Sequence, residues 1–269
     1  EKRARTEREH RKALDDPRQF VFCYQPQVDM KTNQVIGAEA LIRWNHPEQG
    51  LIMPSEFISI AEDTGMIIPI GKSLISSLCS QLHTWRTVLT SDFKVSLNLS
   101  SKQIYRQNMA GFIMDQMSRF DIPFSRMNVE ITESLLMKDE QEAATMLAIL
   151  QKNGIKIWLD DFGTGYSSLS YLRRFQVDGI KIDRSFIMDI EHEPQDQTLS
   201  EAIISMARKM KISVIAEGVE KKAQADFLVS KKCRLGQGYL YGRPMPAKEL
   251  EELFLKPALP AEDIQSVAN

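Results

Sequence analysis

The chain has 269 residues, of which 43% are apolar, and a formal net charge of −2. This charge provides no general field for attracting a nucleic-acid polymer, and the longest apolar stretches, such as 65–78, are too short and too polar to span a bilayer. Cys23, Cys79 and Cys233 lack CxxC spacing, which favours free thiols over disulfides or zinc ligands. We therefore expect a cytoplasmic domain that makes no membrane contact.

The two ends of the chain differ in composition from its middle. Residues 3–14 are dense in Arg and Glu, and their simplest interpretation is a solvated surface helix with i,i+4 ion pairs. We favour a linker, because the numbering begins at Glu1 and a charged helix with little apolar surface needs support from elsewhere. The predicted organisation is a linker helix at 1–18, one domain at 19–255 and a loose tail at 256–269.

Hydrophobic periodicity and turn residues divide the domain into strands and helices. It opens with adjacent strands at 19–30 and 35–43, joined by a turn at 31–34, which predicts an antiparallel start. The other predicted strands are 93–100, 127–132, 155–161, 179–183, 213–217 and 236–240. The predicted helices are 54–62, 67–87, 102–120, 141–153, 168–175, 197–210, 223–230 and 247–254.

Eight strands with helices after most of them predict an α/β fold, a modified TIM (β/α)8 barrel with an antiparallel first strand. Side chains alternate along a strand, so Val95 and Leu97 face away from Ser96 and Asn98. If the apolar faces meet the helices, the polar faces line the barrel.

Polar side chains recur where these buried strands end. They are Glu39, Asn98, Glu130, Asp160, Asp161, Lys181 and Glu217. Active sites of such barrels form at the strand ends, so these groups would converge on one mouth. Charges buried there are costly unless something compensates them. A donor set made only of oxygen favours Mg²⁺ or Mn²⁺ over zinc.

The pair Asp160-Asp161 is the sharpest local signal. Neighbours on a regular strand point apart, so both carboxylates can face one site only if the strand ends there. Gly163 and Gly165 support such an end, because glycine permits unusual φ values. By itself the pattern would favour an exposed Asp-Asp turn before a glycine. The other acids favour a carboxylate between two metals with its neighbour on the second.

Lys181 is the remaining cation at these strand ends. It is either an exposed lysine or a group that steadies a hydroxide or a phosphoryl oxygen. The histidines, His10, His46, His83 and His192, lie outside every predicted strand end. They are predicted to be surface or turn residues, not ligands.

Taken in order, these motifs resemble the EAL family of cyclic di-GMP phosphodiesterases. The run Glu39-Ala40-Leu41-Ile42-Arg43 is similar to the signature that names the family. The further matches are Gln25-Pro26, Asn98-Leu99-Ser100, Glu130-Ile131-Thr132-Glu133, the run from Asp160 to Ser168, Lys181-Ile182-Asp183, Glu217-Gly218-Val219-Glu220 and Gln237-Gly238-Tyr239. The resemblance covers roughly residues 19–254, without departure at these positions.

The resemblance implies hydrolysis of cyclic di-GMP to linear 5′-pGpG by a water that two metals activate. It implies Mg²⁺ or Mn²⁺, two per site, with Ca²⁺ inhibitory. One metal would be held by Glu39, Asn98, Glu130 and Asp160. The second would be held by Asp160, Asp161 and Glu217.

The resemblance also implies roles for residues around the metals. The catalytic residues would be Lys181, Glu217 and Glu133, the last as an anchor for the loop 163–168. The substrate-binding residues would be Gln25, Leu41, Arg43, Asp183, Glu220, Gln237 and Pro244. The implied partners are cyclic di-GMP, a second copy of the chain in a homodimer, and an upstream sensory or GGDEF-type domain.

Two other functions are weighed against this one. A non-catalytic module that only binds cyclic di-GMP is disfavoured because Glu39, Asp160, Asp161 and Lys181 are all present. A barrel that performs acid/base chemistry on carboxylate substrates, as enolase-like barrels do, is disfavoured by the adjacent Asp pair and the complete signature.

Overall fold

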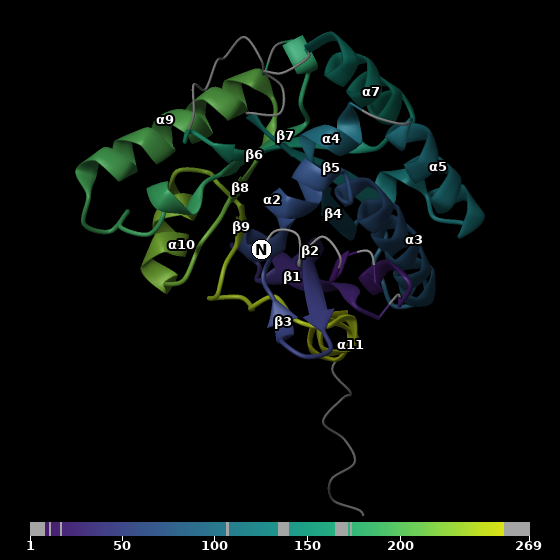
Figure 1. The fold of residues 1–269 in the computed structure, drawn as a ribbon. Helices are drawn as coiled ribbons and strands as arrows, with labels where there is room; N and C mark the ends of the chain where they lie inside the picture. The colour runs from purple at the N-terminus through teal and green to yellow at the C-terminus, as the bar shows by residue number, and fades with distance from the viewer. Residues whose placement is uncertain are drawn as a thin grey trace, which may run out of the picture.

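The structure is a computed structural model that describes residues 9–10, 12–16, 18–105, 108–133, 140–164, 172 and 174–255. Eight strands close into a barrel, with helices around the outside (Figure 1). The strands are β1 (Phe20–Asp29), β2 (Gln34–His46), β4 (Lys94–Asn98), β5 (Met127–Thr132), β6 (Lys156–Phe162), β7 (Gly179–Ile182), β8 (Ser213–Ala216) and β9 (Leu235–Gln237). The predicted α/β barrel is thereby confirmed.

The strand order around the barrel is β1, β9, β8, β7, β6, β5, β4, β2 and back to β1. Strand β1 is antiparallel to both of its neighbours, β2 and β9. The remaining barrel pairs are parallel. The turn between β1 and β2 is too short for a crossover connection, so these two strands pair as a hairpin. The predicted antiparallel first strand is therefore confirmed.

The outer layer consists of helices with one buried face each. They are α2 (Pro54–Thr64), α3 (Ile67–Trp85), α4 (Ser101–Ile104), α5 (Met109–Arg119), α7 (Glu140–Lys152), α9 (Pro194–Met210), α10 (Lys222–Ser230) and α11 (Ala247–Leu250), with the short turns η1 (Phe124–Arg126), η2 (Arg184–Phe186) and η3 (Glu251–Leu255). Along α3, Ile70, Leu74 and Leu78 recur every fourth residue and are buried, as an amphipathic helix requires. None of the described helices is long and apolar enough to cross a bilayer.

Several predicted elements differ from the observed ones. A short strand, β3 (Gly50–Ile52), pairs with the outer end of β2 and was not predicted. The helix predicted at 102–120 is two helices, because Asn108 adopts a left-handed conformation and caps α5 by accepting a hydrogen bond from the Gly111 N–H. Strand β9 stops at Gln237, since the Tyr241 N–H closes a turn on the Gly238 carbonyl. The helix predicted at 168–175 lies mostly outside the described residues.

The predicted solvated helix at the N-terminus is only partly solvated. Residues 9–10 and 12–14 are helical, with His10 and Ala13 fully buried. The His10 ring lies 4.8 Å from that of Trp44, in a cluster with Phe20 and Phe57. The expectation that His10 is a surface residue was therefore wrong. His10 and Ala13 are three positions apart and therefore lie on one face of this charged helix, which packs against Phe20, Trp44 and Phe57.

Candidate active site

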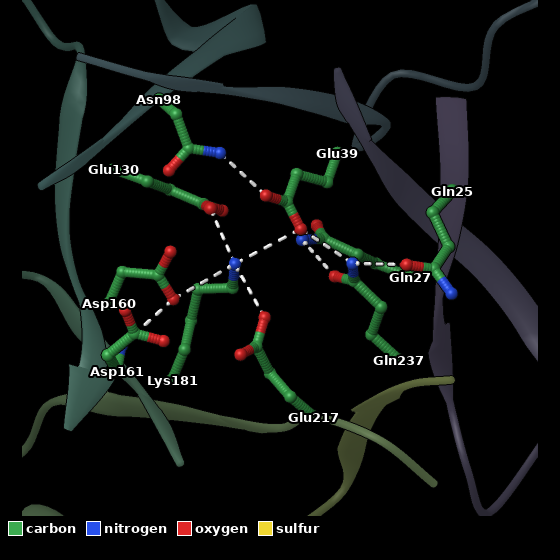
Figure 2. A network of polar contacts seen from close by, with 10 residues as sticks. All are labelled: Gln25, Gln27, Glu39, Asn98, Glu130, Asp160, Asp161, Lys181, Glu217 and Gln237. Carbon is green, nitrogen blue, oxygen red and sulfur yellow. Dashed lines mark hydrogen bonds and ion pairs between the residues drawn. The ribbon is translucent and has the colours of Figure 1, made fainter. Parts of the chain in front are cut away.

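The polar side chains predicted at the strand ends meet at one end of the barrel, around the ammonium group of Lys181 (Figure 2). Lys181 Nζ lies 2.6 Å from a Glu130 oxygen and 2.7 Å from a Glu217 oxygen. It also lies 3.1 Å from Glu39 and 3.2 Å from Asp160. The lysine is 1% exposed. It is therefore a buried cation shared by four carboxylates, and the alternative of an exposed lysine was wrong.

Glu39 receives hydrogen bonds on both of its oxygens. The Asn98 amide donates to Oε1 over 2.6 Å, and the Gln237 amide donates to Oε2 over 2.6 Å. Gln237 Nε2 also donates to Gln25 Oε1, and Gln27 donates to Gln237 Oε1, both over 3.0 Å. Glu39 thus stands at the end of a chain of buried amides that begins on β1 (Figure 2).

The carboxylates form two groups that share one residue. The first group is Glu39, Glu130 and Asp160, and the second is Asp160, Asp161 and Glu217. Within each group, ligand oxygens lie within 4.8 Å of one another. Two overlapping groups of this size have the arrangement that a pair of divalent cations needs when one carboxylate contacts both.

Further features of the donor set fit divalent cations that prefer oxygen. Both groups offer only carboxylate oxygens, with the Asn98 amide beside the first. Glu130 Oε1 is buried without a hydrogen-bond partner among the described residues. Such an atom is costly to bury unless a cation or a water approaches it. The residues present therefore fit a site for Mg²⁺ or Mn²⁺.

The Asp pair reaches this site by a bulge and not by the end of its strand. The register between β6 and β7 shifts between Leu159 and Phe162, and Asp161 has a φ of 54°, in the left-handed region. A bulge of this kind lets two successive side chains lie on the same side of the strand. The expectation that the strand ends at Asp160-Asp161 was therefore wrong, although both carboxylates do face the site.

Burial and the surrounding acids act in opposite directions on the pKa of Lys181. Burial lowers it, but Glu130, Glu217, Glu39 and Asp160 together raise it well above its usual value. Glu39 shows the complementary effect. Burial raises its pKa, but the Lys181 charge and the hydrogen bonds from Gln237 and Asn98 outweigh burial and leave the pKa below its usual value. Lys181 therefore stays cationic and Glu39 stays ionised.

Glu130, Glu217 and Asp161 hold their protons more tightly than ordinary carboxyl groups do. Burial raises the pKa of Glu130 well above its usual value, although the Lys181 charge opposes this. Burial also raises the pKa of Glu217 to about 8, again against Lys181. Burial and the neighbouring Asp160 and Asp183 charges raise the pKa of Asp161 to about 6. The site thus carries more carboxylates than its own cation can neutralise.

A cavity of about 440 Å³ lies between strands β2 and β4 of the barrel and the helices α2 and α3. Leu41, Asn98 and Thr132 line it from the barrel, and α2 and α3 contribute Ile58, Glu62 and Leu74 among others. Asn98 belongs both to this cavity and to the hydrogen bonds of Glu39. The cavity therefore reaches the edge of the candidate active site at Asn98, although none of the five carboxylates lines it.

The remaining predicted substrate residues lie outside the contacts of Lys181 and Glu39. Asp183 caps η2 by accepting a hydrogen bond from the Ser185 N–H over 2.9 Å. The Arg43 guanidinium donates to the Ile42 carbonyl and forms no ion pair in the described part of the chain. Glu220 is exposed. Pro244 precedes Met245, whose backbone bonds with that of Tyr24 on β1.

Two predictions about single residues remain, one for Glu133 and one for the histidines. Glu133 lies just beyond β5 and is half-buried, but most of the loop 163–168 that it is predicted to anchor lies outside the described residues. The candidate ligand groups found in the described ranges contain no histidine. His46 was predicted to lie in a turn or at the surface, but it is the buried last residue of β2, and its Nδ1 accepts hydrogen bonds from the backbone of Glu48 and Gln49 in the turn that follows.

Sequence reasoning missed Gln27. It lies two residues beyond Gln25 on β1, so both side chains point to the same face of the strand. This alternation along β1 was the signal in the sequence that could have identified Gln27.

The three cysteines are free thiols, as predicted.

Comparison with known proteins agrees with this geometry. The EAL domain family profile matches residues 7–244. The bifunctional diguanylate cyclase/cyclic di-GMP phosphodiesterase MucR of Pseudomonas aeruginosa is 40% identical over 240 residues, which are 89% of this chain and 35% of MucR. The cyclic di-GMP phosphodiesterase PdeR of Escherichia coli is 38% identical over 91% of this chain and 36% of PdeR. The chain thus spans about a third of the length of these relatives.

Solved structures show the same fold. The cyclic di-GMP complex of the PaMucR phosphodiesterase superposes with a TM-score of 0.86 at 39% identity, covering 91% of this chain and 99% of that one. The manganese and cyclic di-GMP complex of Klebsiella pneumoniae BlrP1 gives a TM-score of 0.72 at 29% identity, covering 84% of this chain and 56% of that one. With a family match across most of its length and a barrel of the same shape, the chain belongs to the EAL domain family.

Proposed function

We propose that this domain hydrolyses one phosphodiester bond of cyclic di-GMP to give linear 5′-pGpG. The observation that carries the proposal is the pair of carboxylate groups that share Asp160 around Lys181. The complexes of the related PaMucR and BlrP1 with cyclic di-GMP support the choice of substrate.

Electrostatics supports a requirement for divalent cations. Five acids surround one lysine here, namely Glu39, Glu130, Asp160, Asp161 and Glu217, so an anionic phosphodiester would be repelled from the site. Glu39, Asn98, Glu130 and Asp160 would hold one cation, and Asp160, Asp161 and Glu217 the second. When bound, such cations supply Lewis acidity toward a phosphoryl oxygen and make water more acidic.

Lys181 and Glu217 would lie beside the attacking water. Lys181 remains protonated, because four carboxylates raise its pKa, so it can donate a hydrogen bond to the attacking water or to a phosphoryl oxygen. Glu217 lies 2.7 Å from Lys181 Nζ, so as a ligand of the second cation it would also hold the lysine ammonium beside the attacking water.

The substrate would lie across the open end of the barrel. Leu41 and the adjoining cavity offer an apolar surface to a guanine base, and Arg43 on the same strand would face a phosphate. Gln25, Gln237, Asp183, Glu220 and Pro244 would shape the rest of the pocket. Glu133 would anchor the loop after β6 without touching the substrate.

One incubation tests the proposed reaction. The purified protein with cyclic di-GMP and Mg²⁺ or Mn²⁺ should yield 5′-pGpG on chromatography, and Ca²⁺ should not support turnover because its larger, looser shell acidifies water poorly. Binding of cyclic di-GMP without any product in Mg²⁺ or Mn²⁺ would identify a receptor module instead. We also propose, from the family resemblance, that the domain forms a homodimer and that the complete protein carries an upstream sensory or GGDEF-type domain. Light scattering of the complete protein would test the dimer.

A further inference from the structure

The side chain of Gln27 is buried inside the barrel beneath the candidate active site. It is 2% exposed, and its Nε2 donates a 3.0 Å hydrogen bond to Gln237 Oε1. Gly37 lies directly across the β1–β2 pair, and a Cβ at Gly37 would come within 3.3 Å of Gln27 Oε1. A Cβ at Gly37 would meet the Lys94 carbonyl oxygen even more closely, at 2.5 Å, so the glycine is required by the neighbouring strand and also leaves the Gln27 amide its space.

The bond from Gln27 supports the one orientation of the Gln237 amide that suits Glu39. Gln237 Oε1 accepts from Gln27, so its Nε2 points the other way, where it donates to Gln25 Oε1 and to Glu39 Oε2 (Figure 2). An ionised carboxylate only accepts hydrogen bonds. A reversed Gln237 would place its own oxygen against the oxygen of Glu39, which is repulsive.

We propose that Gln27 is a positioning residue that fixes the Gln237 amide so that Gln237 holds Glu39 in the orientation that a divalent cation requires. This inference rests on the proposed function and extends it to a residue that touches neither metal nor substrate. Hydrogen bonds behind a metal ligand fix its orientation, and losing one typically weakens metal affinity or activity about 10- to 100-fold.

The test measures the binding of Mg²⁺ alone by calorimetry, without substrate. Gln27→Met keeps the length of the side chain and removes its donor, and it should weaken Mg²⁺ binding about 10-fold. In the turnover assay, kcat at fixed subsaturating Mg²⁺ should fall in parallel. Gln116→Met is the matched control. Gln116 is also buried, but its amide oxygen accepts from Ser76 on the outer helices, so this variant should lose stability and keep wild-type Mg²⁺ affinity.

A double-mutant cycle shows whether Gln27 acts through Gln237. Gln27→Met should weaken Mg²⁺ binding in the wild-type background and add nothing in a Gln237→Met background. Wild-type affinity in Gln27→Met, or an equal further loss in the double variant, would overturn the proposal. Gln27→Asn, one methylene too short to reach Gln237, serves as the second variant. If neither variant folds by circular dichroism, Gln27 is structural and the proposal is also overturned.

Failure of the proposed function is distinguishable from failure of this inference. Glu39→Ala should abolish the calorimetric signal, which assigns that signal to the site. A wild-type protein that binds Mg²⁺ but releases no 5′-pGpG would refute the phosphodiesterase proposal, while the Mg²⁺ affinities of the Gln27 variants would still decide the positioning role.

Discussion

At the scale of single residues, Lys181 is the charge on which the other side chains of the site depend. It contacts four carboxylates that come from four different parts of the barrel, and it is almost completely buried. A buried charge of this kind is stable only with partners of opposite sign. Its position explains how so many acids can lie together at the end of a folded barrel.

Asp160 is the residue shared by the two carboxylate groups. Asp160→Asn should lower kcat at least about 1,000-fold, because the effects of a metal are worth several kcal/mol and 1.36 kcal/mol is a factor of ten. Circular dichroism should show an unchanged fold, since the substitution leaves the apolar core intact. Near-normal hydrolysis by this variant would disprove the assignment of the site.

Asp161 combines a functional side chain with a strained backbone. Its φ of 54° costs conformational energy for most residues but not for glycine. Asp161→Gly should therefore raise the free energy of unfolding by about 1 kcal/mol, while it lowers kcat at least tenfold through loss of a ligand. Urea denaturation and the turnover assay measure the two effects. A clear loss of stability in this variant would argue against strain at this position.

At the scale of elements, the interior of the barrel is filled by side chains that the neighbouring strands must accommodate. Trp158 on β6 lies against Gly179 on β7, and its ring occupies the space where a Cβ of residue 179 would be. The polar face of the strands therefore does not line an open channel. A large ring below the carboxylates closes the barrel and keeps the acids near its mouth.

Gly179→Ala tests this packing between β6 and β7. The added methyl group would overlap the indole of Trp158, and overpacking of this type typically costs about 1–3 kcal/mol. We expect a loss of this size in thermal or urea unfolding. The double variant with Trp158→Leu should recover part of it, because the smaller side chain removes the overlap. Equal stability of Gly179→Ala and wild type would show that the ring moves aside freely.

At the scale of the whole molecule, the crowding of acids links stability to pH and to metal. Burial raises the pKa of Glu217 from its usual 4.5 to about 8, and that of Asp161 from 3.8 to about 6. At a pH between the pKa of such a group in the unfolded chain and its pKa in the folded protein, the folded protein holds more protons than the unfolded chain. Its stability therefore falls as pH rises through this window.

In EDTA, the melting temperature should accordingly decrease between pH 5.5 and 8.5. Mg²⁺ competes with these protons, so its affinity should increase over the same range and the decrease should be smaller in saturating Mg²⁺. Calorimetric melting curves at three pH values, with and without Mg²⁺, measure both effects. In Glu217→Gln the pH dependence in EDTA should be weaker. A melting temperature with the same pH dependence in EDTA as in Mg²⁺ would contradict this linkage.

Much of the barrel followed from the sequence, because strand and helix patterns are local. The alternation at Ser96 and Asn98, the buried face of α3 and the short turn between β1 and β2 each depend on neighbouring residues only. The convergence of Glu39, Glu130, Asp160, Asp161 and Glu217 could also be expected, since strand ends of a barrel meet at one mouth. The residue types alone indicated oxygen ligands.

The sequence by itself determined the fold class, the end of the barrel that carries the chemistry and the family to which the chain belongs. Only the tertiary structure decided that Lys181 lies among four carboxylates, that a bulge turns Asp161 toward Asp160, and that Gln27 donates a hydrogen bond to Gln237. These features depend on pairs far apart in the chain, such as Glu39 and Gln237, which are 198 positions apart. A local pattern carries no information on such distances, because closure of the barrel sets them.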